Sequence, residues 1–189
     1  MKIFYMILIH QIFFQGMFIA KNIFLKKKIR HSIRGKNLEA RISILLFAIF
    51  IITALSLTFF NSRSGEYKIL NQDIATRIGL TLLLFNILIS VASLLNLGDS
   101  WRVGVIEDQK TELVSTGIYR FTRNPYFITY IIMLFAYTII LQNFLLLCLT
   151  IICMIFIQSM ILKEEKYLLN VHGEKYIAYK KQVPRYILF

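Results

Sequence analysis

The longest apolar stretch of the chain is Pro125–Leu162, which reads PYFITYIIMLFAYTIILQNFLLLCLTIICMIFIQSMIL and contains no charged residue. A single helix of these 38 residues would be roughly 57 Å long, nearly twice the thickness of the hydrocarbon core of a bilayer. We therefore interpret the stretch as a hairpin of two membrane spans that turns near the polar pair Gln142-Asn143. The arms of such a hairpin are antiparallel, so its two outer ends lie at the same face of the membrane.

Three shorter apolar stretches precede the hairpin: Ile3–Ala20, Ile42–Phe60 and Ile78–Leu97. Of all 189 residues, 57% are hydrophobic and 17% are charged, whereas soluble domains carry about 25% charged residues. The sequence therefore predicts an all-α integral membrane protein with about five transmembrane helices, the last two of which form a C-terminal helical hairpin.

The first apolar stretch has an alternative interpretation as a cleaved signal peptide. Only Lys2 precedes its apolar part, and Phe18 occupies a position where signal cleavage requires a small side chain. We therefore expect a retained helix. Its polar residue His10 is expected to face other helices rather than to form a proton relay.

Lys and Arg residues are unevenly distributed among the connecting segments. Segments 21–41, 98–124 and 163–189 contain eight, four and six of them, whereas segment 61–73 contains two. Because cytoplasmic loops are enriched in Lys and Arg, this alternation predicts an N-terminus outside the membrane and a cytoplasmic C-terminus. The clustering between apolar runs also argues against nucleic acid as the partner that explains the net charge of +12.

These boundaries divide the chain into two predicted parts. Residues 1–97 form three N-terminal transmembrane helices with a basic cytoplasmic loop, 21–41. Residues 98–189 form a second part with three segments: a loop (98–124), the helical hairpin (125–162) and a cytoplasmic tail (163–189).

The outer ends of the hairpin bring aromatic and acidic groups together. Asn124–Phe127 at its start is predicted to lie close to Glu164 and Glu165 at its end, at the boundary between membrane and water. Such a site could hold a polar, partly cationic cofactor and admit a substrate from the lipid phase. Two alternatives stay open. The glutamates could instead form a solvated helix end beside Lys163 and Lys166. The tyrosines of this region could instead form an aromatic belt at the membrane interface: Tyr119, Tyr126, Tyr167, Tyr176 and Tyr179.

Two motifs resemble signatures of the isoprenylcysteine carboxyl methyltransferase and phospholipid methyltransferase superfamily. The first runs from Thr111 to Phe127 and reads TELVSTGIYRFTRNPYF, where the family has roughly LVTTGPYRxxRHPxY. The second resembles EExxLxxxxGxxYxxYxxxVP and is matched by these residues: Glu164, Glu165, Leu168, Gly173, Tyr176, Tyr179, Val183 and Pro184. The motifs occur in the family's order, one hairpin apart, and the resemblance covers about residues 95–189.

This resemblance implies an integral-membrane methyltransferase that uses S-adenosylmethionine and acts on a lipid-like or small apolar substrate from the bilayer. In the family the cofactor lies on the cytoplasmic side, between the two motifs and under the tail. Carried over by position, the cofactor-binding residues are Thr111, Glu112, Leu113, Val114, Tyr119, Asn124, Pro125, Tyr126, Phe127 and Glu164. A carboxylate and aromatic faces suit the sulfonium and ammonium groups of this cofactor. No catalytic residue is assigned, and no metal is expected.

The chain departs from the family pattern at three positions. Asn124 replaces a histidine, Phe127 replaces a tyrosine, and Met160 stands where prenylcysteine methyltransferases carry an arginine that could hold a substrate carboxylate. The fold and the cofactor therefore carry over better than the prenylcysteine substrate. The methyl acceptor stays open among a carboxylate, a thiol and an amine.

Two other functions compete with this interpretation. The first is a membrane reductase related to sterol reductases, which would bind NADPH instead of S-adenosylmethionine. The second is a non-enzymatic membrane module, which would tolerate substitution of Asn124, Glu164 and Glu165.

Overall fold

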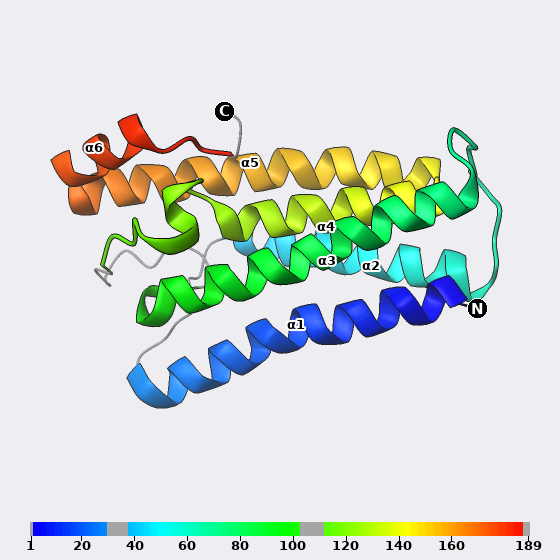
Figure 1. The fold of residues 1–189 in the computed structure, drawn as a ribbon, viewed down its shortest axis with the longest axis horizontal. Helices are drawn as coiled ribbons and strands as arrows, with labels where there is room; N and C mark the ends of the chain where they lie inside the picture. The colour runs from blue at the N-terminus through cyan, green and yellow to red at the C-terminus, as the bar shows by residue number, and fades with distance from the viewer. Residues whose placement is uncertain (1, 30–37, 103–111, 187–189) are drawn as a thin grey trace.

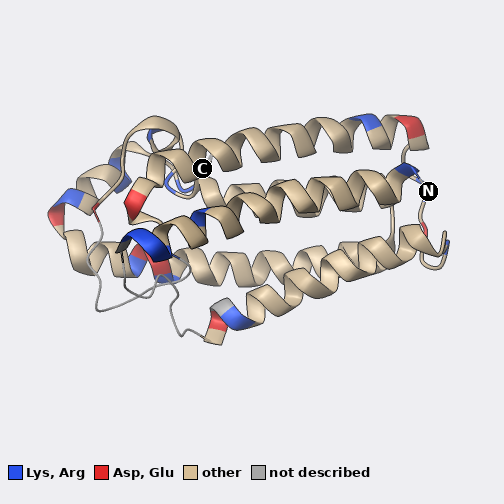
Figure 2. Ribbon diagram, turned by 90° about the horizontal axis from the view of Figure 1, so that it is seen from below, with Lys and Arg blue, Asp and Glu red and all other residues tan. Residues whose placement is uncertain are grey.

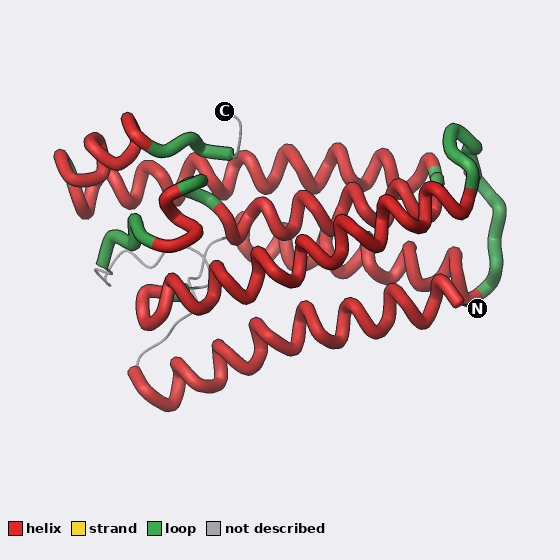
Figure 3. Tube along the Cα trace, viewed as in Figure 1, coloured by secondary structure: helices red, strands yellow, loops and turns green. Residues whose placement is uncertain are grey.

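The computed structural model describes residues 2–29, 38–102 and 112–186. These ranges contain six α-helices and two short 3-10 helices (Figure 1): α1 (Lys2–Ile29), α2 (Leu38–Phe59), α3 (Gln72–Leu97), η1 (Gly98–Ser100), η2 (Gly117–Arg120), α4 (Pro125–Leu141), α5 (Phe144–His172) and α6 (Glu174–Gln182). Figure 3 shows that helix makes up nearly all of the chain in these ranges. Consecutive helices from α1 to α5 run in opposite directions, and α6 lies at one end of the bundle.

The helices confirm the predicted all-α membrane fold. Four of them, α1, α2, α3 and α5, are long and apolar enough to cross a bilayer. The fifth, α4, has 17 residues and a length of about 25 Å, at the lower limit for a span. Both α1 and α5 continue beyond their apolar stretches, because Lys, Glu and Leu are good helix formers and extend a helix into water.

The hairpin turns at Gln142 and Asn143, as predicted. The side chain of Asn143 caps α5 by accepting hydrogen bonds from the backbone N–H groups of Leu145 and Leu146. Gln142 adopts a left-handed conformation (φ 41°), and its side chain accepts hydrogen bonds from the backbone of the segment that connects α2 to α3. The polar pair therefore both ends α4 and ties this connection to the hairpin.

Polar side chains hold α1 against α3 and α4. The His10 ring is hydrogen-bonded through Nδ1 to the Tyr137 hydroxyl (2.7 Å) and through Nε2 to Asn86 Oδ1 (3.0 Å). Gln11 donates to the same tyrosine hydroxyl (2.8 Å). Because lipid is as apolar as leucine, hydrogen bonds of this kind and close packing replace the hydrophobic effect in joining membrane helices. His10 faces other helices, as expected from the sequence.

Most Lys and Arg residues in the described ranges lie at the end of the bundle that holds α6 (Figure 2). At this end α1 and α3 finish and α4 begins. The chain segments that flank 30–37 and 103–111 therefore share one end with the tail.

Candidate functional site

The outer ends of the hairpin meet at the basic end of the bundle. Pro125 occupies the first turn of α4, where its missing N–H costs no hydrogen bond. The Asn124 side chain lies within 3.5 Å of the Glu165 carboxylate, on the last part of α5. The antiparallel geometry inferred from the sequence thus brings these motifs into contact.

Glu165 is buried, and its charge is fully paired. Arg123 donates from its terminal nitrogen to Oε1 (2.9 Å), and Arg185 donates from Nε to Oε1 (2.9 Å) and from Nη2 to Oε2 (2.7 Å). Since a buried carboxylate is stable only with partners of this kind, Glu165 joins three segments that are distant in sequence.

The tail folds back over the start of α4. Backbone N–H of Arg123 donates to the Pro184 carbonyl (3.0 Å), and the Thr122 hydroxyl donates to the Arg185 carbonyl (2.8 Å). The Arg123 guanidinium also donates to the carbonyl of Val183 (2.8 Å). Residues 183–186 therefore form a strap, which we call the C-terminal strap, across the site.

Arg123 and Arg185 are absent from the residues predicted for the site. Arg123 lies inside the first motif, and the signal for its role is the acidic pair that the second motif places opposite. Arg185 follows directly after the second motif, so no motif position indicated it.

Glu164 differs from its neighbour. It is half-buried, and it forms no hydrogen bond or ion pair with any part of the chain that the structure describes. Tyr119 of η2 and Tyr126 of α4 lie within electrostatic range of its carboxylate. Burial raises the pKa of Tyr119 well above its usual value, and the Glu164 charge raises it further. Glu164 is therefore a carboxylate near two tyrosines that has no positively charged partner among the described residues.

An aromatic cluster surrounds Tyr126. Its ring lies 4.6 Å from Trp101 and 5.2 Å from both Phe18 and Tyr130, measured between ring centroids. The hydroxyls of Tyr126 and Tyr130 are hydrogen-bonded (3.1 Å). Aromatic rings from α1, α4 and the segment after η1 thus pack together around Tyr126, which lies within electrostatic range of Glu164.

The remaining residues predicted for the site lie in varied surroundings. Leu113 packs against a cluster formed by Tyr176, Tyr179 and Val183 of the tail. Val114 is half-buried, Glu112 is exposed, and Phe127 is buried in the bundle core. Thr111 lies outside the described residues. The structure thus brings Leu113, Tyr119, Asn124, Tyr126 and Glu164 to one end of the bundle.

Two of the departures from the family pattern have structural partners here. The Asn124 amide donates to Glu165 and to the Arg185 carbonyl (3.3 Å), so it holds the strap. The Met160 sulfur accepts a hydrogen bond from the Ser43 hydroxyl (2.8 Å), which joins α5 to α2. Neither side chain offers a positive charge.

Two buried donors of the site have no acceptor in the described structure: the Tyr176 hydroxyl and Arg123 Nε. Burial, together with the charge of Glu165, raises the pKa of Tyr176 to about 12, and the charge of Arg123 opposes this rise. The tyrosine and the arginine therefore lie within electrostatic range of each other.

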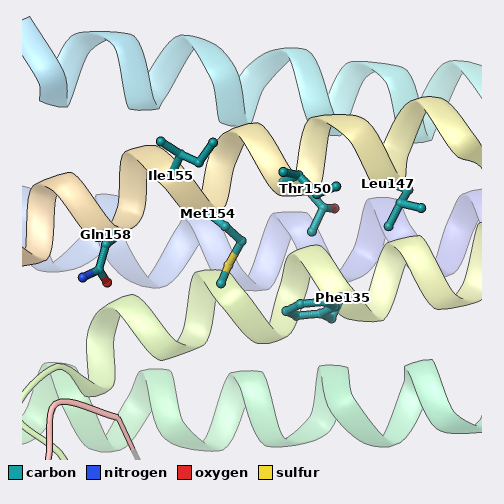
Figure 4. A pocket seen from close by; sticks show the side chains of 7 residues that line it. Phe135, Leu147, Thr150, Met154, Ile155 and Gln158 are labelled. Atoms are coloured by element: carbon teal, nitrogen blue, oxygen red, sulfur yellow. The ribbon is translucent and has the colours of Figure 1, made fainter. Parts of the chain in front are cut away.

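An apolar groove of about 410 Å³ lies on the apolar segments of α4 and α5 (Figure 4). It is lined by Phe135, Leu147, Thr150, Ile151, Met154, Ile155 and Gln158. Its polar end is Gln158, which accepts a hydrogen bond from Tyr186 of the strap. The groove includes none of the residues predicted to bind the cofactor.

The fold and these contacts define a multi-pass membrane protein with a candidate ligand site at the basic end of its helix bundle. Residues 74–175, from the first turn of α3 to the start of α6, match the phospholipid methyltransferase family. The match covers more than half of the 189 residues, and the chain belongs to this family. A search of curated proteins found no match.

Membership of the family establishes the enzyme class. The chain is a membrane methyltransferase that uses S-adenosylmethionine, and membership of this family implies a lipid substrate in the membrane. The sequence alone left open a reductase and a non-enzymatic module. Membership of a methyltransferase family favours neither of these two functions.

Proposed function

We propose that the protein methylates a lipid-like acceptor at the cytoplasmic face of the membrane and that Glu164 binds the positive charge of S-adenosylmethionine. The observation that carries this proposal is the contrast between the two adjacent glutamates. Glu165 is saturated by Arg123 and Arg185, whereas Glu164 is half-buried and unpaired within the described residues. A carboxylate kept free in such surroundings suits a cationic ligand.

The residues around Glu164 fit the cofactor's chemistry. When bound, S-adenosylmethionine supplies a methyl group on a positively charged sulfur, which an in-line displacement transfers. Tyr119 and Tyr126 supply aromatic rings near Glu164, and aromatic rings attract cations. The C-terminal strap is hydrogen-bonded across the start of α4 at the same end of the bundle. The proposed cofactor-binding set remains Thr111, Glu112, Leu113, Val114, Tyr119, Asn124, Pro125, Tyr126, Phe127 and Glu164. Residues 98–189 supply the site in this account, and residues 1–97 frame it.

The acceptor side of the proposal departs from isoprenylcysteine carboxyl O-methyltransferases. The chain resembles them in its cofactor motifs, but Met160 is engaged with Ser43 and offers no charge for a substrate carboxylate. The apolar groove on α4 and α5 offers contact for a hydrocarbon chain. These features support a lipid-like acceptor. They do not support an acceptor whose carboxylate is bound by the residue at position 160.

The test is a product analysis with the protein in lipid vesicles and methyl-labelled S-adenosylmethionine. We expect label in the organic extract. Mild alkali releases the label as methanol from a methyl ester and leaves N-methyl and S-methyl products intact, so the same samples identify the acceptor class. Absence of label from every lipid fraction, with a folded protein that binds the cofactor, would contradict a lipid-like acceptor.

The proposed orientation follows from the charge at the α6 end of the bundle, since segments rich in Lys and Arg remain cytoplasmic. A reporter fused after Phe189 that is active only in the cytoplasm should be active. Activity of an exterior-only reporter at the same position would reverse the orientation.

A further inference from the structure

Two hydrogen-bond donors are buried in the site without an acceptor in the described structure. Tyr176 is 1% exposed, and its hydroxyl has no partner. The Arg123 side chain is 7% exposed, and its Nε–H is likewise unpartnered. Native proteins pair nearly all buried polar groups, so two unpaired donors in one site indicate an acceptor that a ligand brings.

The other nitrogens of Arg123 are already engaged. One terminal nitrogen donates to the carbonyls of Lys180 and Val183, and the other donates to Glu165. These contacts fix the guanidinium, so Nε is the donor left over. Tyr176 is fixed as well, because it packs with Tyr179 in the tail cluster.

Both donors lie beside the glutamate pair. Arg123 contacts Glu165 directly, and Tyr176 is within electrostatic range of Glu164, Glu165 and Arg123. The site therefore offers a free carboxylate for a cation and two free donors for an anion. Tyr176 packs against Val183, and Arg123 donates to the Val183 carbonyl, so the two donors lie in one neighbourhood. A carboxylate has two oxygens and accepts several hydrogen bonds, so it can serve two such donors.

We propose that the Tyr176 hydroxyl and Arg123 Nε–H bind the carboxylate of S-adenosylmethionine, opposite to the ammonium and sulfonium groups that Glu164 serves. This inference rests on the proposed function. Tyr176 and Arg123 then bind the amino acid part of the cofactor. The enzyme therefore binds analogues without the cofactor's carboxylate more weakly than the cofactor itself.

The experiment compares equilibrium binding of S-adenosylmethionine and its decarboxylated analogue, which retains the sulfonium and the amine. The full-length wild type and Tyr176→Phe are measured in detergent. The wild type should bind the cofactor at least about tenfold more tightly than the analogue. Tyr176→Phe should weaken cofactor binding about tenfold, the effect of one hydrogen bond to a charged group, and change analogue binding less than about twofold.

Tyr179→Phe is the matched control. The Tyr179 hydroxyl donates to the Tyr119 carbonyl (2.7 Å). Its removal therefore affects the local fold but removes no donor proposed to bind the carboxylate of the cofactor. Its ratio of cofactor affinity to analogue affinity should equal that of the wild type. Without ligand, Tyr176→Phe should melt at or above the wild-type temperature, because it removes an unpaired hydroxyl, whereas Tyr179→Phe should melt lower.

The outcomes separate the two proposals. If the wild type binds both ligands equally, or if Tyr176→Phe weakens both equally or neither, the carboxylate subsite is wrong and the methyltransferase site stands. If the folded wild type binds neither ligand, the proposed cofactor site fails and this inference fails with it. If Tyr176→Phe does not fold, the carboxylate subsite is tested by the affinities of the wild type for S-adenosylmethionine and for its decarboxylated analogue.

Discussion

Glu165→Gln should release the C-terminal strap, whereas Glu164→Gln should leave it in place. Glutamine keeps the shape of Glu165 but removes the charge that Arg123 and Arg185 share. Loss of one partner from a buried ion pair costs about 3–5 kcal/mol, and we expect about 3 kcal/mol because glutamine still accepts one hydrogen bond. The Arg185 side chain is also 28% exposed, which favours the lower value.

This magnitude translates into a measurable rate. At 1.4 kcal/mol per factor of ten, about 3 kcal/mol raises the open population of the strap about 100-fold. Trypsin cleavage after Lys181 and Arg185 tracks that population when reclosing outpaces cleavage. Tail cleavage should therefore be about 100-fold faster in Glu165→Gln and within about threefold of wild type in Glu164→Gln. Equal rates in the two variants would refute the division of roles between the glutamates.

Three further substitutions test the fold that carries the site. Asn86→Ala removes one of the two hydrogen-bond partners of His10 and should cost about 1 kcal/mol of stability. A thiol-reactive dye that labels the buried Cys153 on unfolding should report a lower melting temperature, and an unchanged melting temperature would show that this network does not stabilise the fold. In Gly79→Ala the new methyl group would overlap the Ile140 side chain and should lower the melting temperature. Adding Ile140→Ala should recover part of the loss, and no recovery would show that the overlap with Ile140 is not its cause. Gly117→Ala strains a left-handed backbone conformation (φ 61°) just before Tyr119. It should weaken cofactor binding while lowering the melting temperature only slightly, and unchanged binding would show that η2 does not contribute to the cofactor site.

The fold could be predicted because membrane spans leave a strong one-dimensional signal. Thirty-eight residues without charge exceed one span, and a polar pair near their middle ends one helix and caps the next. The continuation of α5 to His172 was harder to predict, because the apolar signal stops at Leu162 while helix propensity does not.

The site could be predicted only where contacts follow from the hairpin. Asn124 and Glu165 meet because both flank antiparallel arms. The strap contacts of Arg123 and Arg185 depend on how the tail folds back after α6, and spacing along the chain contains no information on that path. Sequence alone also could not divide the roles of Glu164 and Glu165, because the division depends on which neighbour faces the arginines.

The most direct test of the central claim is equilibrium binding of labelled S-adenosylmethionine to the detergent-purified protein. Wild type and Glu164→Gln are compared, with Glu174→Gln as a control, since Glu174 is an exposed carboxylate at the start of α6. We expect saturable binding by the wild type and by the control, and binding at least about tenfold weaker in Glu164→Gln, because a charge-assisted contact is lost. Equal affinity in all three proteins would contradict the assignment of Glu164 as the carboxylate that binds the cofactor.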